Sequence, residues 1–234
     1  MGNIKNILIV RTDRVGDVAL TFPIIYLLKK NIPNSNIFFM VTEYTKDLLE
    51  YDQNIKKLII LDKSFIKNYL ILKKNKIDVA IVASPKFILA LLFFLVGIPI
   101  RIGTAYRWYS FLFNKKHYEH RKYGNKHELE YNFNLLKELN LNIDYNISYP
   151  IAITEKDKSR VDSLVELSEK NIKLITVHPG SGGSALDLPL DKMKELLIEI
   201  NKIKNVKICL TGLEKEAEHI NQLNSSIDNK ALCF

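Results

Sequence analysis

Cysteine is scarce in this chain of 234 residues, which has only Cys209 and Cys233. Two distant cysteines provide neither a metal-binding motif nor a disulfide framework, so the composition fits a reducing cytoplasm. The first residues run directly into an apolar segment, which predicts no signal peptide. These absences favour a cytoplasmic protein.

Long apolar runs are also missing. The longest extends from Phe87 to Ile100 and is interrupted by Gly97 and Pro99. A membrane-spanning helix needs about 20 apolar residues. The run therefore predicts a buried helix that ends at Gly97, and not a membrane anchor.

Several common ligand-binding motifs are absent as well. The dinucleotide fingerprint needs three glycines, but Gly16 is the only glycine in the first loop. The glycine-rich loop at 178–184 is not followed by the Gly-Lys-Ser/Thr of a phosphate-binding Walker loop. No Asp-x-Asp occurs, and the histidines lack metal-ligand spacing. We therefore predict no metal site.

The bulk composition is that of a globular protein, with 47% hydrophobic and 26% charged residues. The formal net charge of +8 favours anionic partners such as nucleic acid, phosphorylated metabolites or an anionic membrane face. Because the lysines are spread along the chain, most of them are expected on a solvated surface.

Short apolar segments alternate with helical patterns in the first part of the chain, which predicts an α/β fold with a parallel sheet. We expect a first domain over residues 1–150. Its predicted strands lie near 5–10, 37–41, 57–61, 78–82 and 99–103, and its predicted helices near 17–31, 43–50, 64–75 and 86–96.

A second α/β unit is expected over residues 151–234, after a linker at 140–153. Its predicted strands are 173–177, 206–210 and the start of one near 230, with a helix at 191–203. So few strands would leave a bare sheet edge. We therefore expect this domain to be partial, with further strand–helix units beyond Phe234.

The first loop brings Arg11, Asp13, Arg14 and Asp17 to the carboxyl end of a strand, where open α/β sheets bind ligands. Asp17 opens a helix, so it is either a helix cap or a general base. Arg11 and Arg14 either pair with the two aspartates or bind phosphate.

Residues 101–126 contain seven Lys or Arg, among them Arg101 and Arg107, against one acid, and aromatic residues are interleaved. Such a stretch fits nucleic acid, an anionic acceptor or anionic lipid. A purely structural role, with the aromatic residues packed under a long loop, explains the pattern at least as well. An amphipathic helix follows, and His127 and Glu128 are expected to start it and not to bind metal.

The second loop signal is His178-Pro-Gly-Ser-Gly-Gly-Ser184. Gly180, Ser181, Gly182, Gly183 and Ser184 would bring backbone N–H groups close to a phosphate or pyrophosphate, although a flexible turn is the alternative. Gly212 lies in a matching loop after the next strand. Glu214 and Glu216 follow it, either as ribose ligands or as acids that complement a helix dipole.

Four motifs together resemble glycosyltransferase family 9, the heptosyltransferases. They are the loop 11–23, His127-Glu-Leu-Glu130, the loop 178–185 and Thr211-Gly-Leu-Glu-Lys-Glu216. The resemblance implies a GT-B architecture of two Rossmann-like domains with parallel sheets and a site in the cleft. It also implies a metal-independent, inverting transfer of a heptose or related sugar.

The resemblance implies roles for individual residues. Asp17 would deprotonate the acceptor, the Gly180–Ser184 loop would face the donor pyrophosphate, and Glu216 or Glu214 would bind the ribose. The donor would be a nucleotide-sugar, ADP-heptose in this family, and no cofactor is needed. Arg11, Arg14, Arg101 and Arg107 would meet a lipopolysaccharide-core or lipid-linked acceptor at the cytoplasmic face of the inner membrane. Nucleic acid is not expected as a partner.

Two departures from the family pattern put activity in doubt. Leu186 stands where the family has a Lys or Arg that neutralises the leaving diphosphate, so Arg14 or another cation would have to replace it. A later Asp-Thr/Ser-Gly-Pro-x-His element is absent. A non-catalytic module that binds a nucleotide-sugar, from a truncated or degenerate transferase, is therefore the alternative function.

Overall fold

The structure is a computed structural model that describes residues 4–147, 149, 151–165, 172–183 and 185–234. The chain forms two compact units, Met1–Thr154 and Glu155–Phe234. The sequence pattern predicted a domain boundary at residue 150.

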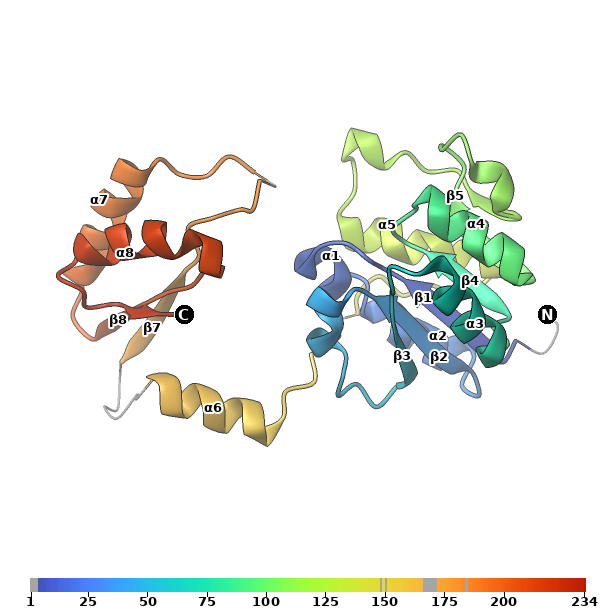
Figure 1. Ribbon diagram of the computed structural model, residues 1–234, viewed down its shortest axis with the longest axis horizontal. Coiled ribbons are helices and arrows are strands. Elements are labelled where there is room, and N and C mark those ends of the chain that lie inside the picture. The colour runs from blue at the N-terminus through green and yellow to red at the C-terminus, as the bar shows by residue number, and fades with distance from the viewer. Residues whose placement is uncertain (1–3, 148, 150, 166–171, 184) are drawn as a thin grey trace. The chain divides into compact units, whose positions relative to one another are not determined.

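The amino-terminal unit contains a six-stranded parallel sheet with the order β3-β2-β1-β4-β5-β6 (Figure 1). The chain runs outward from β1 to β3 and then crosses back to β4, so the strand order reverses between β1 and β4. The strands are β1 (Asn6–Val10), β2 (Asn36–Val41), β3 (Ile55–Ile60), β4 (Val79–Val82), β5 (Ile100–Thr104) and β6 (Lys115–His117).

Helices cover both faces of this sheet because both sides of its central strands are apolar. Ile7 and Ile9 of β1 pack into one buried cluster, whereas Leu8 and Val10 pack into another on the opposite face. The first cluster includes α2 and α5, and the second includes α3 and α4. The helices are α1 (Val15–Ala19), α2 (Pro23–Asn31), η1 (Glu43–Leu48), α3 (Phe65–Asn75), α4 (Phe87–Val96), η2 (Ser110–Leu112), η3 (Arg121–Tyr123), α5 (Glu128–Asn134) and η4 (Leu135–Leu139).

Three local expectations for this unit were wrong. The helix predicted at 17–31 is two helices, because Pro23 has no N–H to donate and starts α2 instead of continuing α1. The helix predicted near 43–50 is the 3₁₀ helix η1. The apolar helix α4 ends at Gly97, as predicted, but four of its side chains are exposed, so it is only half buried.

The carboxyl-terminal unit contains the parallel sheet β7-β8-β9, formed by β7 (Lys173–Val177), β8 (Val206–Leu210) and β9 (Leu232–Cys233). Its helices are α6 (Glu155–Val165), α7 (Leu190–Asn201), η5 (Glu214–Glu216) and α8 (Ala217–Ser225). A small core joins α7 and α8 to β8, centred on Leu197, Leu210 and Leu223. Both cysteines lie in strands, as predicted.

None of the helices in the described part of the chain combines the length and apolar character that a membrane crossing requires.

Candidate functional site

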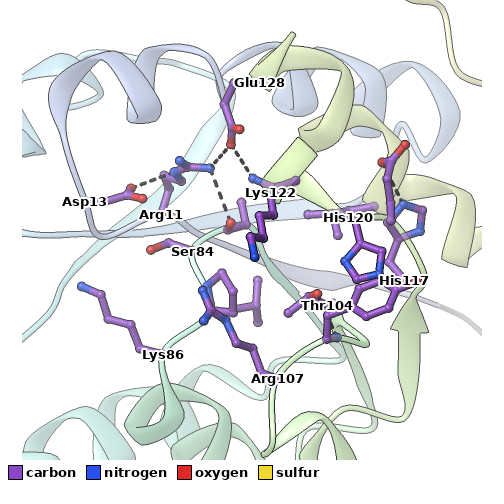
Figure 2. Close-up of a pocket in the computed structure, with 17 residues that line it drawn as sticks. Arg11, Asp13, Ser84, Lys86, Thr104, Arg107, His117, His120, Lys122 and Glu128 are labelled. Carbon is purple, nitrogen blue, oxygen red and sulfur yellow. Dashed lines mark hydrogen bonds and ion pairs between the residues drawn. The ribbon is translucent and has the colours of Figure 1, made fainter. Parts of the chain in front are cut away.

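A pocket of ≈ 730 Å³ opens at the carboxyl ends of β1, β4 and β5 in the amino-terminal unit (Figure 2). Arg11 and Asp13 follow β1, Ser84 and Lys86 follow β4, and Thr104 ends β5. This is the edge of the sheet where the strand order reverses, and doubly wound sheets bind ligands at that edge.

Arg11 organises one wall of this pocket. Its side chain is only 5% exposed, yet it forms ion pairs with three carboxylates. Its guanidinium is 2.7 Å from Asp13, 2.9 Å from Asp17 and 2.8 Å from Glu128. A buried cation of this kind needs charged partners to offset its loss of hydration. The network therefore fixes both aspartates of the first loop and the start of α5.

Asn132 of α5 extends the network towards α1. It accepts a hydrogen bond from Arg11 at 3.2 Å and donates to the carbonyl oxygen of Leu20 at 3.0 Å. Arg121 pairs with Glu128 and also donates to Asn132 at 3.2 Å. Glu128 thus lies between two guanidinium groups, which tie the first loop to α5 and η3.

Burial and ion pairing shift the pKa values of Arg11 and Arg121 in opposite directions. Burial alone would lower the pKa of Arg11, but Asp13, the hydrogen bond to Glu128 and Asp17 together raise that pKa. Burial lowers the pKa of Arg121, and the nearby charge of Arg11 adds to this effect although Glu128 opposes it. Arg11 therefore remains firmly cationic at the centre of its carboxylates.

Three other cations line the pocket without a carboxylate partner among the described residues, namely Lys86, Arg107 and Lys122. Lys86 donates instead to the carbonyl oxygen of Thr12 at 3.0 Å. Figure 2 shows the side chains of Arg107 and Lys122 directed towards each other, whereas that of Lys86 extends to the side of Asp13. The pocket consequently offers uncompensated positive charge to an anionic ligand.

The predicted acceptor residues lie in different places. Arg11 and Arg107 line the pocket, and Asp17 contacts Arg11, whereas Arg14 precedes α1 with an exposed side chain. Arg101 is near the start of β5, and its guanidinium donates to the carbonyl oxygens of Ile98 and Leu112. Arg101 is not among the residues that line the pocket, and its acceptor role stays a prediction.

The carboxyl-terminal unit brings Gly180, Gly212 and Glu216 together at the carboxyl ends of β7 and β8. A Cβ atom on Gly180 would lie 2.6 Å from Oε1 of Glu216, and one on Gly212 would lie 3.3 Å from Oε2. Oε2 also accepts a hydrogen bond from the backbone N–H of Leu213 at 2.8 Å. The two predicted loops are thus held side by side around one carboxylate.

The other residues predicted to bind the donor are more dispersed. Gly182 and Gly183 adopt positive φ angles of 58° and 80°, which favour glycine. Ser181 donates its backbone N–H to Asp187 at 2.8 Å. Glu214 is exposed, and Ser184 lies outside the described residues. Leu186, at the position of the family's cation, is fully exposed.

Several residues of the pocket escaped sequence reasoning. Ser84 and Lys86 closely follow an apolar strand, so the sequence could have placed them at the ligand-binding edge of the sheet. Glu128 was noted at a helix start and in a family motif, but without a role in the site. Its neighbour Asn132, which contacts Arg11 outside the pocket lining, gave only a helical pattern. The partner of both, Arg11, is more than 100 residues away in sequence. His127 starts α5 by accepting a hydrogen bond from the N–H of Leu129, as predicted.

In the described ranges, no three His, Cys, Asp or Glu side chains come together in a way that could hold a metal ion.

Solved structures similar to this chain have the same fold. A family 9 glycosyl transferase from Veillonella parvula superposes with a TM-score of 0.83 at 23% identity, covering 98% of this chain and 68% of that one. ADP-heptose lps heptosyltransferase II from E. coli gives a TM-score of 0.71 at 19% identity, covering 97% and 71%. The E. coli heptosyltransferase WaaC, solved with ADP-2-deoxy-2-fluoro heptose, gives 0.68 at 18%, covering 98% and 76%.

Sequence comparisons agree with the fold. A Haemophilus influenzae protein whose name assigns it provisionally to the glycosyltransferases is 27% identical, over 96% of this chain and 68% of that protein. The family model of glycosyltransferase family 9 (heptosyltransferase) matches residues 68–233. This range includes the loops around Glu216 and excludes the loop of Asp17. The chain therefore belongs to glycosyltransferase family 9, and its two Rossmann-like units have the GT-B fold.

Proposed function

We propose that this transferase moves a heptose or related sugar from ADP-heptose to a lipopolysaccharide-core or similar lipid-linked saccharide, at the cytoplasmic face of the inner membrane. The observation that carries the proposal is Asp17, held by Arg11 beside a pocket whose three unpaired cations suit an anionic acceptor. The names of two similar structures mention ADP-heptose chemistry, which supports the same donor.

In the proposed reaction, the carboxylate of Asp17 accepts the proton of an acceptor hydroxyl. The hydroxyl oxygen forms a bond to the anomeric carbon of the donor, and the bond between that carbon and the diphosphate oxygen breaks. The electron pair leaves with the diphosphate, and the anomeric configuration inverts. The role of Arg11 is to position Asp17, since its guanidinium is already saturated by carboxylates. No metal ion takes part in this proposal.

Donor binding is proposed for the carboxyl-terminal unit. Backbone N–H groups of Gly180, Gly182 and Gly183 would face the diphosphate. Ser181, whose own N–H donates to Asp187, would lie beside them with Ser184 and Gly212. Glu216 would accept hydrogen bonds from the ribose hydroxyls, and Glu214 is the second candidate. Lys86, Arg107 and Lys122 would bind the anionic acceptor, and Arg14 remains a candidate beside them.

One observation favours a second candidate function. Leu186 supplies no charge at the position where the family neutralises the leaving diphosphate, and its side chain is fully exposed. A protein without that charge would bind a nucleotide-sugar and not transfer it. This reading predicts ADP-heptose binding with no release of ADP in the presence of an acceptor.

The test is a transfer assay with ADP-heptose and a heptose-free core saccharide, followed by mass spectrometry of the acceptor. The proposal expects an acceptor heavier by one heptose, together with one ADP per transfer. ADP-heptose binding without a product would support the non-catalytic module. Failure to bind ADP-heptose at all would contradict both functions.

A further inference from the structure

An apolar surface covers the outer side of α3 and α4 in the amino-terminal unit. Figure 1 shows these helices side by side over one face of the sheet, and Lys73 at the end of α3 donates to the last carbonyl of α4 at 3.2 Å. Large apolar side chains are exposed on both helices and on the segment just before η2. We call this surface the α3/α4 face, formed by Ile66, Leu70, Ile88, Phe94, Leu95 and Trp108.

Exposed apolar side chains recur along one side of each of the two helices. Ile66 and Leu70 are four residues apart, so they share one side of α3. On α4, Ile88 and Leu95 are two turns apart and also share a side. The ring of Trp108 lies 4.7 Å from that of Phe87 at the start of α4, and Trp108 is 73% exposed. Several large exposed apolar side chains on neighbouring helices indicate an interaction site.

Positive charges predominate around this face, although Lys67 of α3 pairs with Asp62 at 3.5 Å. Residues 63–118, which form α3, β4, α4, β5, η2 and β6, contain ten Lys or Arg and one acid. That acid, Asp78, accepts hydrogen bonds from the backbone of Lys5 and Asn6 before β1 and does not belong to the face. The guanidinium of Arg101 lies 5.4 Å from the ring of Phe94, so positive charge borders the apolar side chains directly.

We propose that the α3/α4 face docks on an anionic lipid bilayer. Aliphatic side chains and an exposed tryptophan would enter the interfacial layer, and the surrounding lysines and arginines would contact acidic headgroups. This proposal rests on the proposed function for its purpose. Lys86 and Arg107 line the acceptor pocket and immediately precede Phe87 and Trp108 in the chain, so docking would bring a lipid-linked acceptor to the pocket.

The observations favour a bilayer over other occupants. A symmetric contact between two copies would place lysines of one copy against lysines of the other, which is unfavourable. Single-stranded nucleic acid stacks on aromatic rings. Ile66, Leu70, Ile88 and Leu95 have no ring to offer, whereas aliphatic side chains partition well into lipid.

Trp108 provides a direct test because it is the only tryptophan in the chain. The experiment adds vesicles of phosphatidylcholine, with or without phosphatidylglycerol, to the full chain and records tryptophan emission and co-sedimentation. The proposal expects co-sedimentation and a shift of emission to shorter wavelength with the anionic vesicles only. Equal binding to neutral vesicles, or none to either, would overturn it. No donor or acceptor is present, so the result is independent of transferase activity.

Variants locate the contact. Leu95→Glu should weaken anionic-vesicle binding at least tenfold, whereas Ile203→Glu, which introduces the same charge at a similarly exposed position in the other unit, should not. Replacing Lys63 and Lys74 by Ala should weaken binding roughly thirty-fold, at about fivefold per lysine. Equal effects of Leu95→Glu and Ile203→Glu, or a protein-concentration-dependent emission shift without lipid, would overturn the proposal.

Discussion

The two units place very different chemistry at the same edge of a parallel sheet. The amino-terminal unit uses long charged side chains, with Arg11 buried among three carboxylates and three further cations around a pocket. The carboxyl-terminal unit uses glycines that approach a single carboxylate, Glu216. Side chains select a ligand by its charge and shape, whereas bare backbone accepts any diphosphate that reaches it. This difference supports the proposal that the first unit selects the acceptor and the second binds the donor.

The largest effect is expected from the carboxylate that we propose as the base. Asp17→Asn should lower turnover by about 10²–10⁴-fold while ADP binding stays close to normal. Asp13→Asn is the matched control, since it also removes one carboxylate partner of Arg11. Steady-state kinetics of both variants distinguish the roles. Equal losses in the two variants would show that the ion pairs matter and that Asp17 has no special role.

The next largest effect is expected from glycine substitutions, which should weaken ADP binding in the carboxyl-terminal unit only. In Gly180→Ala the added Cβ would lie 2.6 Å from Glu216, so the carboxylate must move and ADP binding should weaken roughly ten- to a hundred-fold. Gly16→Ala in the first loop meets no atom within 4 Å and should leave ADP binding unchanged. Calorimetric titration with ADP measures both. Equal affinities would contradict the backbone-based donor site.

Removing the unpaired cations should affect acceptor use alone. Lys86→Ala, Arg107→Ala and Lys122→Ala should each raise the acceptor KM by up to about fivefold, the effect of an exposed ion pair, and added salt should reduce the difference. Lys204→Ala, an exposed lysine of the other unit, serves as the control. An unchanged acceptor KM in all three variants would contradict an anionic acceptor.

The smallest effect concerns Leu186. Leu186→Lys would restore a cation at an exposed position beside the donor loop, and ADP affinity should rise by a few-fold. An unchanged affinity in the same titration would show that another residue already supplies the charge.

Much of the fold could be predicted because its signals are local. Alternation of apolar strands with amphipathic helices correctly gave a parallel α/β sheet, and Gly97 correctly marked the end of α4. Strand β6 was missed because Lys115-Lys116-His117 contains no apolar residue. The exposed side of α4 was missed because a helix of ten apolar residues has no polar face to indicate which side meets solvent.

The site was predictable only in part, for a similar reason. The first loop and the glycine loops follow strands, so topology alone places them at the ligand edge. The links from Arg11 to Glu128 and Asn132 depend on how α5 packs against that edge, which no local pattern reports. Arg101 looked equivalent to Arg107 in composition, but its early place in β5 directs it to backbone carbonyls.

The most direct test of the division between the units is an ADP titration of Glu216→Ala, Glu214→Ala and Asp17→Asn, with thermal melts to confirm folding. The account predicts that Glu216→Ala loses ADP affinity at least tenfold, as expected for lost hydrogen bonds to a charged group. Glu214→Ala and Asp17→Asn should bind ADP as the unmodified protein does. Normal ADP binding by Glu216→Ala, or lost binding by Asp17→Asn, would contradict the account.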